Sequence, residues 1–302
     1  MNRLQRKHIV ILSAVTIILL AVGLYAIFGS SGKNNSFQPQ EEFRLHPWIS
    51  IHIAGIDMSI NRAVLYLFMA AALTSGTMIW IARRMTDRPN KIQTAVEVSY
   101  DLAANNITRG NLSDPKLARR WFAFIATLFF FIWFNNMLGY IPLPTSHEKI
   151  NIFGAQIPAL AIYSATANIS VPLVLTLVVF AVYNIEGIRA KGFVGYLKSF
   201  IPAGVEGPAR IPIFVIEVIS NLVRIISLSV RLFANILAGH LLILFMAGGL
   251  VVLLGLAPLG VLTLLMAVPF FLFEVGLVAT LQAFIFATLT SIYIGGATAE
   301  EH

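Results

Sequence analysis

The 302-residue sequence contains little charge and no cysteine. Charged residues make up 12% of the chain, whereas a soluble domain carries about 25%. A surface that contacts water cannot be built from so few charges, so most of the surface is expected to face lipid. The absence of cysteine excludes disulfide bonds and cysteine metal sites. A Gly-x-x-x-x-Gly-Lys sequence is also absent, which excludes nucleotide binding by a phosphate-binding loop of that type.

Apolar residues make up 58% of the chain and are gathered into long runs. A helix needs about 20 such residues to cross a bilayer, so we expect an all-α integral membrane protein with five to six transmembrane helices. The expected spans are Ile9–Phe28, Ala63–Ala82, Trp121–Ile141, Ala167–Ile185, Ile211–Leu254 and Pro258–Ile294.

The first span, Ile9–Phe28, is interpreted either as a retained helix or as a signal peptide, because basic residues precede it. With the polar linker that follows, it forms an N-terminal extension over residues 1–40. Residues 41–302 are predicted to form a single membrane domain.

The last two apolar runs, Ile211–Leu254 and Pro258–Ile294, are longer than one perpendicular crossing requires. A helix of about 40 residues is about 60 Å long. Each run therefore forms either a strongly tilted helix or two segments. Glycine and proline residues from Gly248 to Pro258 mark the turn between the runs. We predict a long, strongly tilted helical hairpin over residues 211–295.

The segments between the spans are more polar. Lys91–Ile107 is predicted to be a cytoplasmic-side surface helix, Pro142–Ile162 a re-entrant or external loop, and Lys191–Arg210 a basic loop. With both chain ends cytoplasmic, fifteen basic residues lie in inside segments and four in outside segments, as the positive-inside rule requires. This distribution argues against nucleic acid as a partner, because no basic stripe is interleaved with exposed aromatic residues.

A polar stripe crosses the apolar run that begins at Ile211. Its members recur at spacings of three and four, which places them on one helix face. They are Glu217, Ser220, Arg224, Ser227, Arg231 and Asn235. The stripe is about 27 Å long, close to the thickness of the hydrocarbon layer. An arginine at this depth costs at least about 2.5–3.5 kcal/mol, so this face is expected to contact water or a charged partner.

The two arginines of the stripe differ in their expected partners. For Arg224, a simple ion pair with Glu217, two turns away, is the alternative to a role in a channel. Arg231 has no acid three or four residues away. Its partner is therefore expected on the other helix of the hairpin or on another chain, and Gln282 is predicted to face it.

A second polar group comprises Asn235, His240, Glu274 and Gln282. His240 follows Arg231 by nine residues, about 180° around an ideal helix, so it is expected to point elsewhere. A histidine and a carboxylate can both change charge when they are desolvated, so His240 and Glu274 are candidates for a proton-relay pair. The alternatives are a neutral His240 bonded to a carbonyl and an ordinary interhelical hydrogen bond from Gln282.

The residues around Arg231 resemble a known family, subunit a of the F-type ATP synthase. The resemblance is carried by Arg-Leu-Phe-Ala-Asn-Ile-Leu-Ala-Gly-His-Leu-Leu from Arg231 and by Leu-Gln-Ala-Phe-Ile-Phe from Leu281. Weaker similarities, at Lys91–Glu97, Asn135–Pro142 and Ala165–Asn168, extend it over Glu41–His302.

The resemblance implies a non-catalytic stator that conducts protons through two offset half-channels to and from carboxyl groups on a rotating c-subunit ring. Arg231 would separate the half-channels. The outer one would contain Asn235, His240, Glu274 and Gln282. The inner one would contain Glu217, Ser220, Arg224 and Ser227.

The implied partners are the c-subunit ring, the peripheral-stalk b subunits, other ATP synthase subunits and the lipid bilayer, and no cofactor is expected. The implied location is an energy-coupling membrane such as the bacterial inner membrane. The coupling ion, H⁺ or Na⁺, would be selected largely by the ring.

Three positions depart from the family pattern. His240 stands where much of the family has an acid, while the histidine of those members lies on the final helix. Glu274 precedes Gln282 by eight residues, whereas seven is the common spacing. Gly139 stands where some members have an aspartate.

Two other functions would leave different patterns. A secondary transporter with a midplane substrate site would contain an internal repeat with a second broken helix, but the first half of the chain has no intramembrane arginine. A membrane anchor of a respiratory complex would carry paired haem-binding histidines across its spans. His240 is the only histidine well inside an expected span.

Overall fold

A computed structural model describes most of the chain outside its N-terminal region. The described residues are 15, 19, 43–53, 56–57, 59–84, 91–112, 114–145, 149–152, 155–158, 161–201, 207–246 and 259–299. Five helices among them are long and apolar enough to span a membrane, which confirms an all-α integral membrane protein. The expected span Ile9–Phe28 lies outside the described residues except for Val15 and Leu19, so the extension over 1–40 stays a prediction.

The chain is divided into two compact units. One consists of Leu45–Leu237 with Val275–His302, and the other of Met1–Arg44 with Ala238–Glu274. The larger unit contains α2 (Arg62–Arg84), α3 (Lys91–Asp101), α4 (Pro115–Leu138), α5 (Ser170–Lys198) and α9 (Ala279–Thr298).

The helices α2 and α4 confirm two of the expected spans and lie side by side. The helix α4 begins before the expected Trp121, because Asp114 caps its first turn. The Asp114 carboxylate accepts a hydrogen bond of 2.9 Å from the backbone N–H of Lys116, and Pro115 occupies the first helical position. The expected surface helix is present as α3, and the π-helix η2 (Leu102–Arg109) extends it.

The helix α5 continues beyond its expected end at Ile185. The expected loop over Lys191–Arg210 is therefore wrong for Lys191–Lys198. Gly192 kinks the helix with a φ of 74°, a conformation that glycine adopts readily. After the kink, the Tyr196 ring lies directly against Gly187, and its hydroxyl donates a hydrogen bond of 2.8 Å to the Asn184 side chain. This packing keeps the segment helical.

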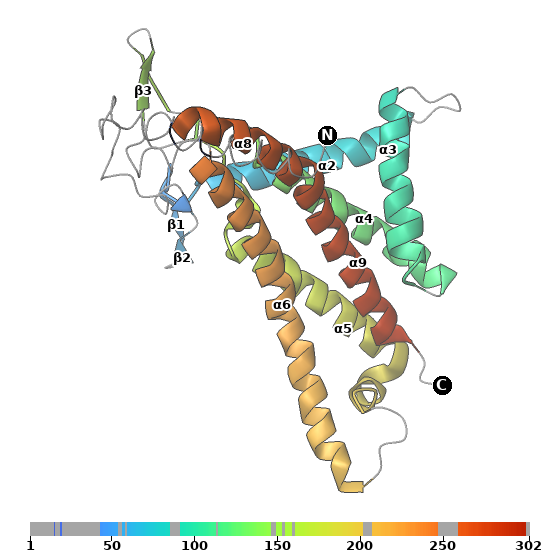
Figure 1. The fold of residues 1–302 in the computed structure, drawn as a ribbon. Coiled ribbons are helices and arrows are strands. Elements are labelled where there is room, and N and C mark those ends of the chain that lie inside the picture. Colours follow the sequence, from blue (N-terminus) through green and yellow to red (C-terminus); the bar gives the residue numbers. More distant parts are fainter. Residues whose placement is uncertain are drawn as a thin grey trace, which may run out of the picture. The chain divides into compact units, whose positions relative to one another are not determined.

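The helix α6 (Arg210–Leu244) is one unbroken helix of 35 residues (Figure 1), preceded by the short 3-10 helix η4 (Gly207–Ala209). Its length is about 52 Å, whereas the hydrocarbon layer is about 30 Å thick. It therefore fits a bilayer only when it is strongly tilted. The expected turn between Gly248 and Pro258 lies outside the described residues.

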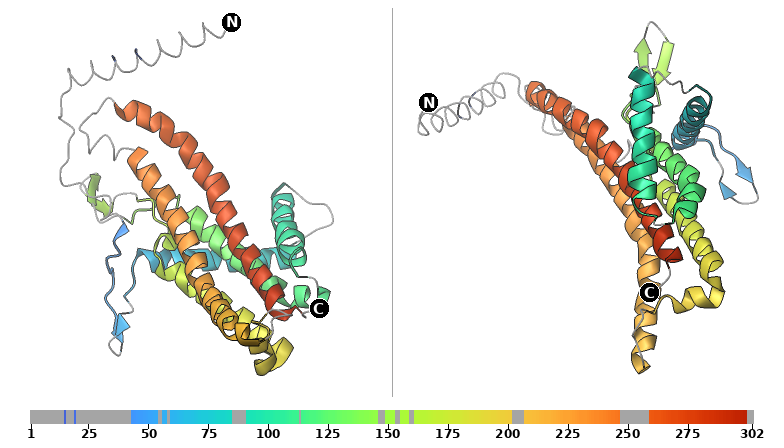
Figure 2. Two further views of the ribbon diagram at one scale, coloured as in Figure 1. Left: turned by 60° about the horizontal axis from the view of Figure 1, so that its bottom comes forward. Right: turned by 90° about the vertical axis from the view of Figure 1, so that its right-hand side faces the viewer.

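The final apolar run is helical from Leu259 to Thr298. It consists of α8 (Leu259–Phe273), the π turn η6 (Glu274–Val278) and α9. The helix α9 packs against both α4 and α5, and the three can be followed side by side in Figure 2.

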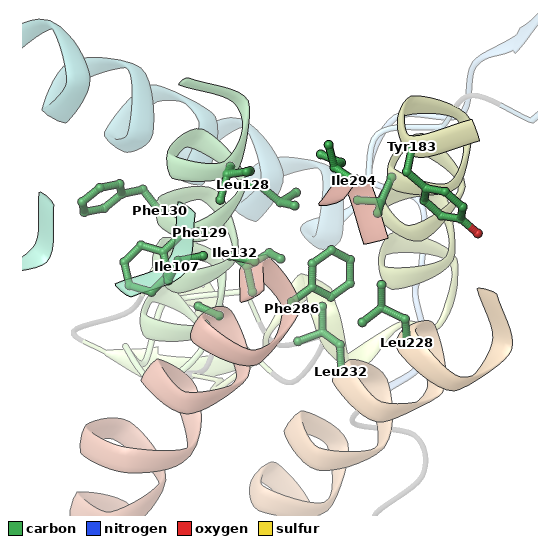
Figure 3. Close-up of a cluster of buried hydrophobic side chains, with 14 of the residues drawn as sticks. Ile107, Leu128, Phe129, Phe130, Ile132, Tyr183, Leu228, Leu232, Phe286 and Ile294 are labelled. Carbon is green, nitrogen blue, oxygen red and sulfur yellow. The ribbon is translucent and has the colours of Figure 1, made fainter. Parts of the chain in front are cut away.

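The main core of the larger unit lies where α4, α5, α6 and α9 meet. Leu228 and Leu232, one turn apart on α6, point toward Phe286 of α9 (Figure 3). Other buried members include Ile107, Leu128, Phe129, Ile132, Tyr183 and Ile294. In lipid, close packing rather than removal of apolar surface from water drives helix association, so this interlocking of side chains determines where α6 sits on α9.

The expected loop Pro142–Ile162 contains a β-hairpin. Its strands β3 (Lys149–Ile152) and β4 (Ala155–Pro158) pair antiparallel, with Ile150 opposite Ile157. A second antiparallel hairpin, β1 (His52–Ile53) with β2 (Ile56–Asp57), precedes α2.

Buried polar side chains tie the end of α4 to the start of α9. Thr166, in the short helix η3 (Ala165–Ala167), donates a hydrogen bond of 2.7 Å to the Asn136 side chain. Asn136 Nδ2 in turn donates to the carbonyl of Ala279 at 3.2 Å. Trp133 Nε1 donates to Thr280 Oγ1 at 3.1 Å. Because polar groups in lipid must be satisfied inside the protein, these bonds hold the first turn of α9.

A buried arginine begins α2. Arg62 is 2% exposed, and its guanidinium carbon lies 4.3 Å from the centre of the Tyr163 ring, a distance typical of a cation–π contact. Burial raises the pKa of the Tyr163 hydroxyl to about 12, although the Arg62 charge opposes this effect. The hydroxyl therefore stays protonated at physiological pH.

Gly139 allows the chain after α4 to approach Ser164 closely. A Cβ atom at Gly139 would lie 2.9 Å from the Ser164 Cα. Gly139→Ala should therefore push the two segments apart and destabilise the protein by about 1–3 kcal/mol. Gly76→Ala is the matched control, because a Cβ there would meet nothing within 4 Å. Thermal unfolding of the purified variants measures the difference, and equal midpoints would contradict the predicted clash.

Candidate functional site

A polar cavity of about 310 Å³ lies between α5, α6 and α9. The helix α6 contributes Glu217, Asn221 and Arg224, whose spacings of four and three place them on one helix face. The other polar residues that line the cavity include Tyr183, Lys191, Tyr196, Ser199 and Tyr293. The cavity is large enough for several water molecules, and its polar lining can bind them.

The two charged stripe residues in this cavity form an ion pair. Arg224 Nη2 lies 3.8 Å from Glu217 Oε1, and the side chains are 38% and 40% exposed. The Arg224 guanidinium carbon also lies 5.1 Å from the centre of the Tyr293 ring. The simple pairing considered for Arg224 therefore occurs. A partly exposed pair contributes only about 0–1 kcal/mol, and both groups remain open to the cavity.

A chain of hydrogen bonds orients Asn221 in the cavity wall. The Tyr183 hydroxyl donates to Asn221 Oδ1 at 2.7 Å, and Asn221 Nδ2 donates to Asn184 Oδ1 at 3.4 Å. The Tyr196 hydroxyl donates to the same Asn184 oxygen at 2.8 Å. The predicted stripe omitted Asn221 in favour of Ser220, although a residue four after Glu217 fits the same face. Tyr183 and Tyr196 carried no sequence signal, because only the kink at Gly192 brings both to the cavity.

The predicted stripe divides into two groups. Glu217 and Arg224 line the cavity, whereas Ser220 and Ser227 are exposed and do not line it. Ser220 is about 100° from Asn221 around α6. Because Asn221 points toward Tyr183 and the cavity, Ser220 points away from the cavity.

Arg231 and Asn235 are exposed on α6. Leu228, Leu232 and Ile236 on the same helix are buried in the core. The structure records no hydrogen bond or ion pair between Arg231 and any other described residue. The chain therefore presents an arginine within a membrane-length helix on a surface that its described part does not cover.

Gln282 is buried in α9, with 5% of its surface exposed. Among the described residues, no hydrogen bond joins it to Arg231. That Gln282 faces Arg231 across the hairpin stays a prediction.

His240 and Glu274 are both buried, with 3% and 7% exposed. A Cβ atom added at Gly239 would overlap the Glu274 carboxylate, so that carboxylate lies against the residue next to His240. Gly239 permits this approach because it has no side chain. The relay pair itself stays a prediction, but the structure brings Glu274 to the part of α6 that the prediction requires.

Glu274 also begins the π turn η6. A π turn contains more residues than an α-helical turn and is common at functional sites. It can therefore accommodate a single added residue within a helix.

The described residues contain no group of three or more histidine, aspartate or glutamate side chains that could hold a metal ion.

A family model and individual known proteins both match this chain, and they agree on one family. Residues 64–295 match the family model described as ATP synthase A chain. The chain is 36% identical over 268 residues to the ATP synthase subunit a of Rubrobacter xylanophilus, and the match covers 84% of this chain and 95% of that protein. It is 34% identical over 268 residues to the ATP synthase subunit a of Brucella ovis, with 87% and 98% covered. Because these matches span nearly the whole membrane region, the chain belongs to the ATP synthase subunit a family.

Proposed function

We propose that this chain is the membrane stator subunit of an F-type ATP synthase. It conducts protons through two offset half-channels to and from the carboxyl groups of a c-subunit ring, and Arg231 separates the half-channels. The exposed Arg231 on an unbroken α6 is the observation that carries the proposal.

An intramembrane arginine needs an anionic or hydrated neighbour, because its burial in lipid costs at least about 2.5–3.5 kcal/mol. A carboxylate on a neighbouring rotor subunit would supply the negative charge. In return, the guanidinium would stabilise the ionised carboxylate and repel a proton travelling directly between the half-channels. Only arginine remains charged at every working pH.

The cavity that contains Glu217, Asn221 and Arg224 is proposed as the inner half-channel. Ala299, at the C-terminal end of the described chain, lines the same cavity. The distribution of basic residues assigns the C-terminus to the cytoplasmic side, so this cavity would open there. Ser220 and Ser227, on the exposed side of α6, would contact the ring.

The outer half-channel is proposed to contain Asn235, His240, Glu274 and Gln282. His240 lies about 14 Å along α6 from Arg231, on the side away from the inner cavity. Buried histidine and carboxylate groups can exchange protons in turn when water connects them.

The proposed setting is the inner membrane of a bacterium. The remaining proposed partners are the peripheral-stalk b subunits and the other ATP synthase subunits. On this proposal ATP is made elsewhere in the complex, and the chain itself carries no catalytic site.

Arg231 provides the most direct test. Arg231→Ala and Arg231→Lys should both abolish ATP-driven proton pumping and proton-driven ATP synthesis, because neither keeps a permanent planar charge at this position. Assembly should survive, because both variants keep Leu228, Leu232 and Ile236, which pack α6 into the core. Pumping is measured in vesicles, with Arg83→Lys as the control for an exposed arginine on another helix. Normal pumping by Arg231→Ala would overturn the proposed mechanism.

The cavity is tested with single cysteines, because the chain has none of its own. A membrane-impermeant thiol reagent added on the cytoplasmic side should modify Asn221→Cys, which lines the cavity. It should not modify Leu228→Cys, because Leu228 is 2% exposed in the core. Mass spectrometry of the labelled chain measures the difference. Equal labelling would show that the cavity is not an aqueous path.

His240→Ala should slow proton translocation by at least about tenfold but leave residual activity, because water replaces part of a relay. Ile243→Ala is the matched control, since Ile243 is buried on the same helix but cannot carry a proton. Translocation rates in vesicles separate the two effects. A wild-type rate in His240→Ala, or equal losses in both variants, would assign His240 a structural role only.

A further inference from the structure

A second cavity, of about 150 Å³, lies between the end of η2 and the start of α4. Arg109 and Arg119 line it, and none of its lining residues is acidic. Its apolar walls include Phe122 and Tyr100, whose rings meet edge to face at 5.1 Å. The cavity therefore combines two cationic groups with an apolar wall.

The Arg119 charge is not neutralised by any described residue. Arg119 has no hydrogen bond or ion pair in the described part of the chain. Its neighbour Arg120, by contrast, donates to Glu186 at 2.8 Å. The two consecutive arginines therefore differ in their contacts, since Arg120 joins α4 to α5 and Arg119 lines the cavity.

Arg109 is oriented without being neutralised. Its Nη1 donates to the Asn105 side-chain oxygen at 3.0 Å, and an amide carries no charge. The acids Asp101 and Asp114 form no ion pair with either arginine in the described part of the chain. Asp101 accepts from Asn105 at 3.1 Å, and Asp114 caps α4 through the backbone of Lys116. Two guanidinium groups with free donors suit a phosphate, which each can bind with paired hydrogen bonds.

The cavity lies where a membrane supplies such phosphates. It adjoins the first turns of the spanning helix α4, at the end that the basic residues assign to the cytoplasmic side. Basic pockets between helices on that side bind anionic lipid headgroups. Beside the cavity, α3 exposes apolar surface, with Val98 65% exposed and Tyr100 37% exposed.

We propose that this cavity binds an anionic phospholipid. Arg109 and Arg119 hold the phosphate, and Tyr100 and Phe122 contact the glycerol and the upper acyl chain. The lipid thereby fastens the surface helix to the start of α4. The site is separate from the proposed proton path, and the proposal rests on the membrane orientation given under the proposed function.

The test compares the purified complex containing Arg109→Gln/Arg119→Gln with a complex containing Arg83→Gln/Lys198→Gln. The control removes the same charge from exposed residues of the same membrane side that do not line the cavity. Native mass spectrometry follows titration of delipidated complex with phosphatidylglycerol or phosphatidylcholine. The wild type and the control should bind one more tightly held phosphatidylglycerol than the cavity variant. Affinity at that site should fall about 30-fold when both arginines are lost.

Three outcomes would overturn the proposal. The first is equal phosphatidylglycerol binding by the cavity variant and the control. The second is displacement of the bound lipid by inorganic phosphate alone, which would make free phosphate the ligand. The third is unchanged lipid binding with loss of peripheral-stalk subunits from the cavity variant, which would indicate an acidic protein partner at the arginines.

Discussion

Polar groups inside a bilayer must find partners within protein or water, because lipid offers none. The helix α6 shows two solutions to this constraint. Arg224 is satisfied within the chain, by Glu217 at 3.8 Å, by the Tyr293 ring and by a polar cavity. Arg231, seven residues later, has no such partner among the described residues. Near its start, α6 therefore satisfies its arginine within the chain. In its middle, the arginine needs a partner outside the described residues.

The constraint also explains how the helices around this site are held. Lipid gives helices little reason to associate by burial of apolar surface, so small residues and interhelical hydrogen bonds carry much of the specificity. Gly139, Gly187 and Gly239 each allow a close approach, to Ser164, Tyr196 and Glu274 respectively. Asn136 and Trp133 hold the start of α9 through hydrogen bonds. The positions of the functional side chains thus depend on contacts that are individually small but geometrically restrictive.

Two consecutive arginines in the first turns of α4 have different surroundings. Arg120 joins α4 to α5 through the buried Glu186, whereas Arg119 lines a cavity beside η2. Consecutive residues of one type can therefore differ in their contacts, and the fold decides which contacts each makes.

The sequence by itself determined the membrane class and predicted a span at each of the five described long helices. Length and apolarity are local properties, so helices such as α2 and α6 could be predicted from composition alone. Only the tertiary structure decided that Lys191–Lys198 is helical and that Asn221, rather than Ser220, enters the cavity. It also decided that Glu274 lies against Gly239. These features depend on contacts with Gly187, Tyr183 and α6, which lie on other turns or other helices, and no local pattern encodes such contacts.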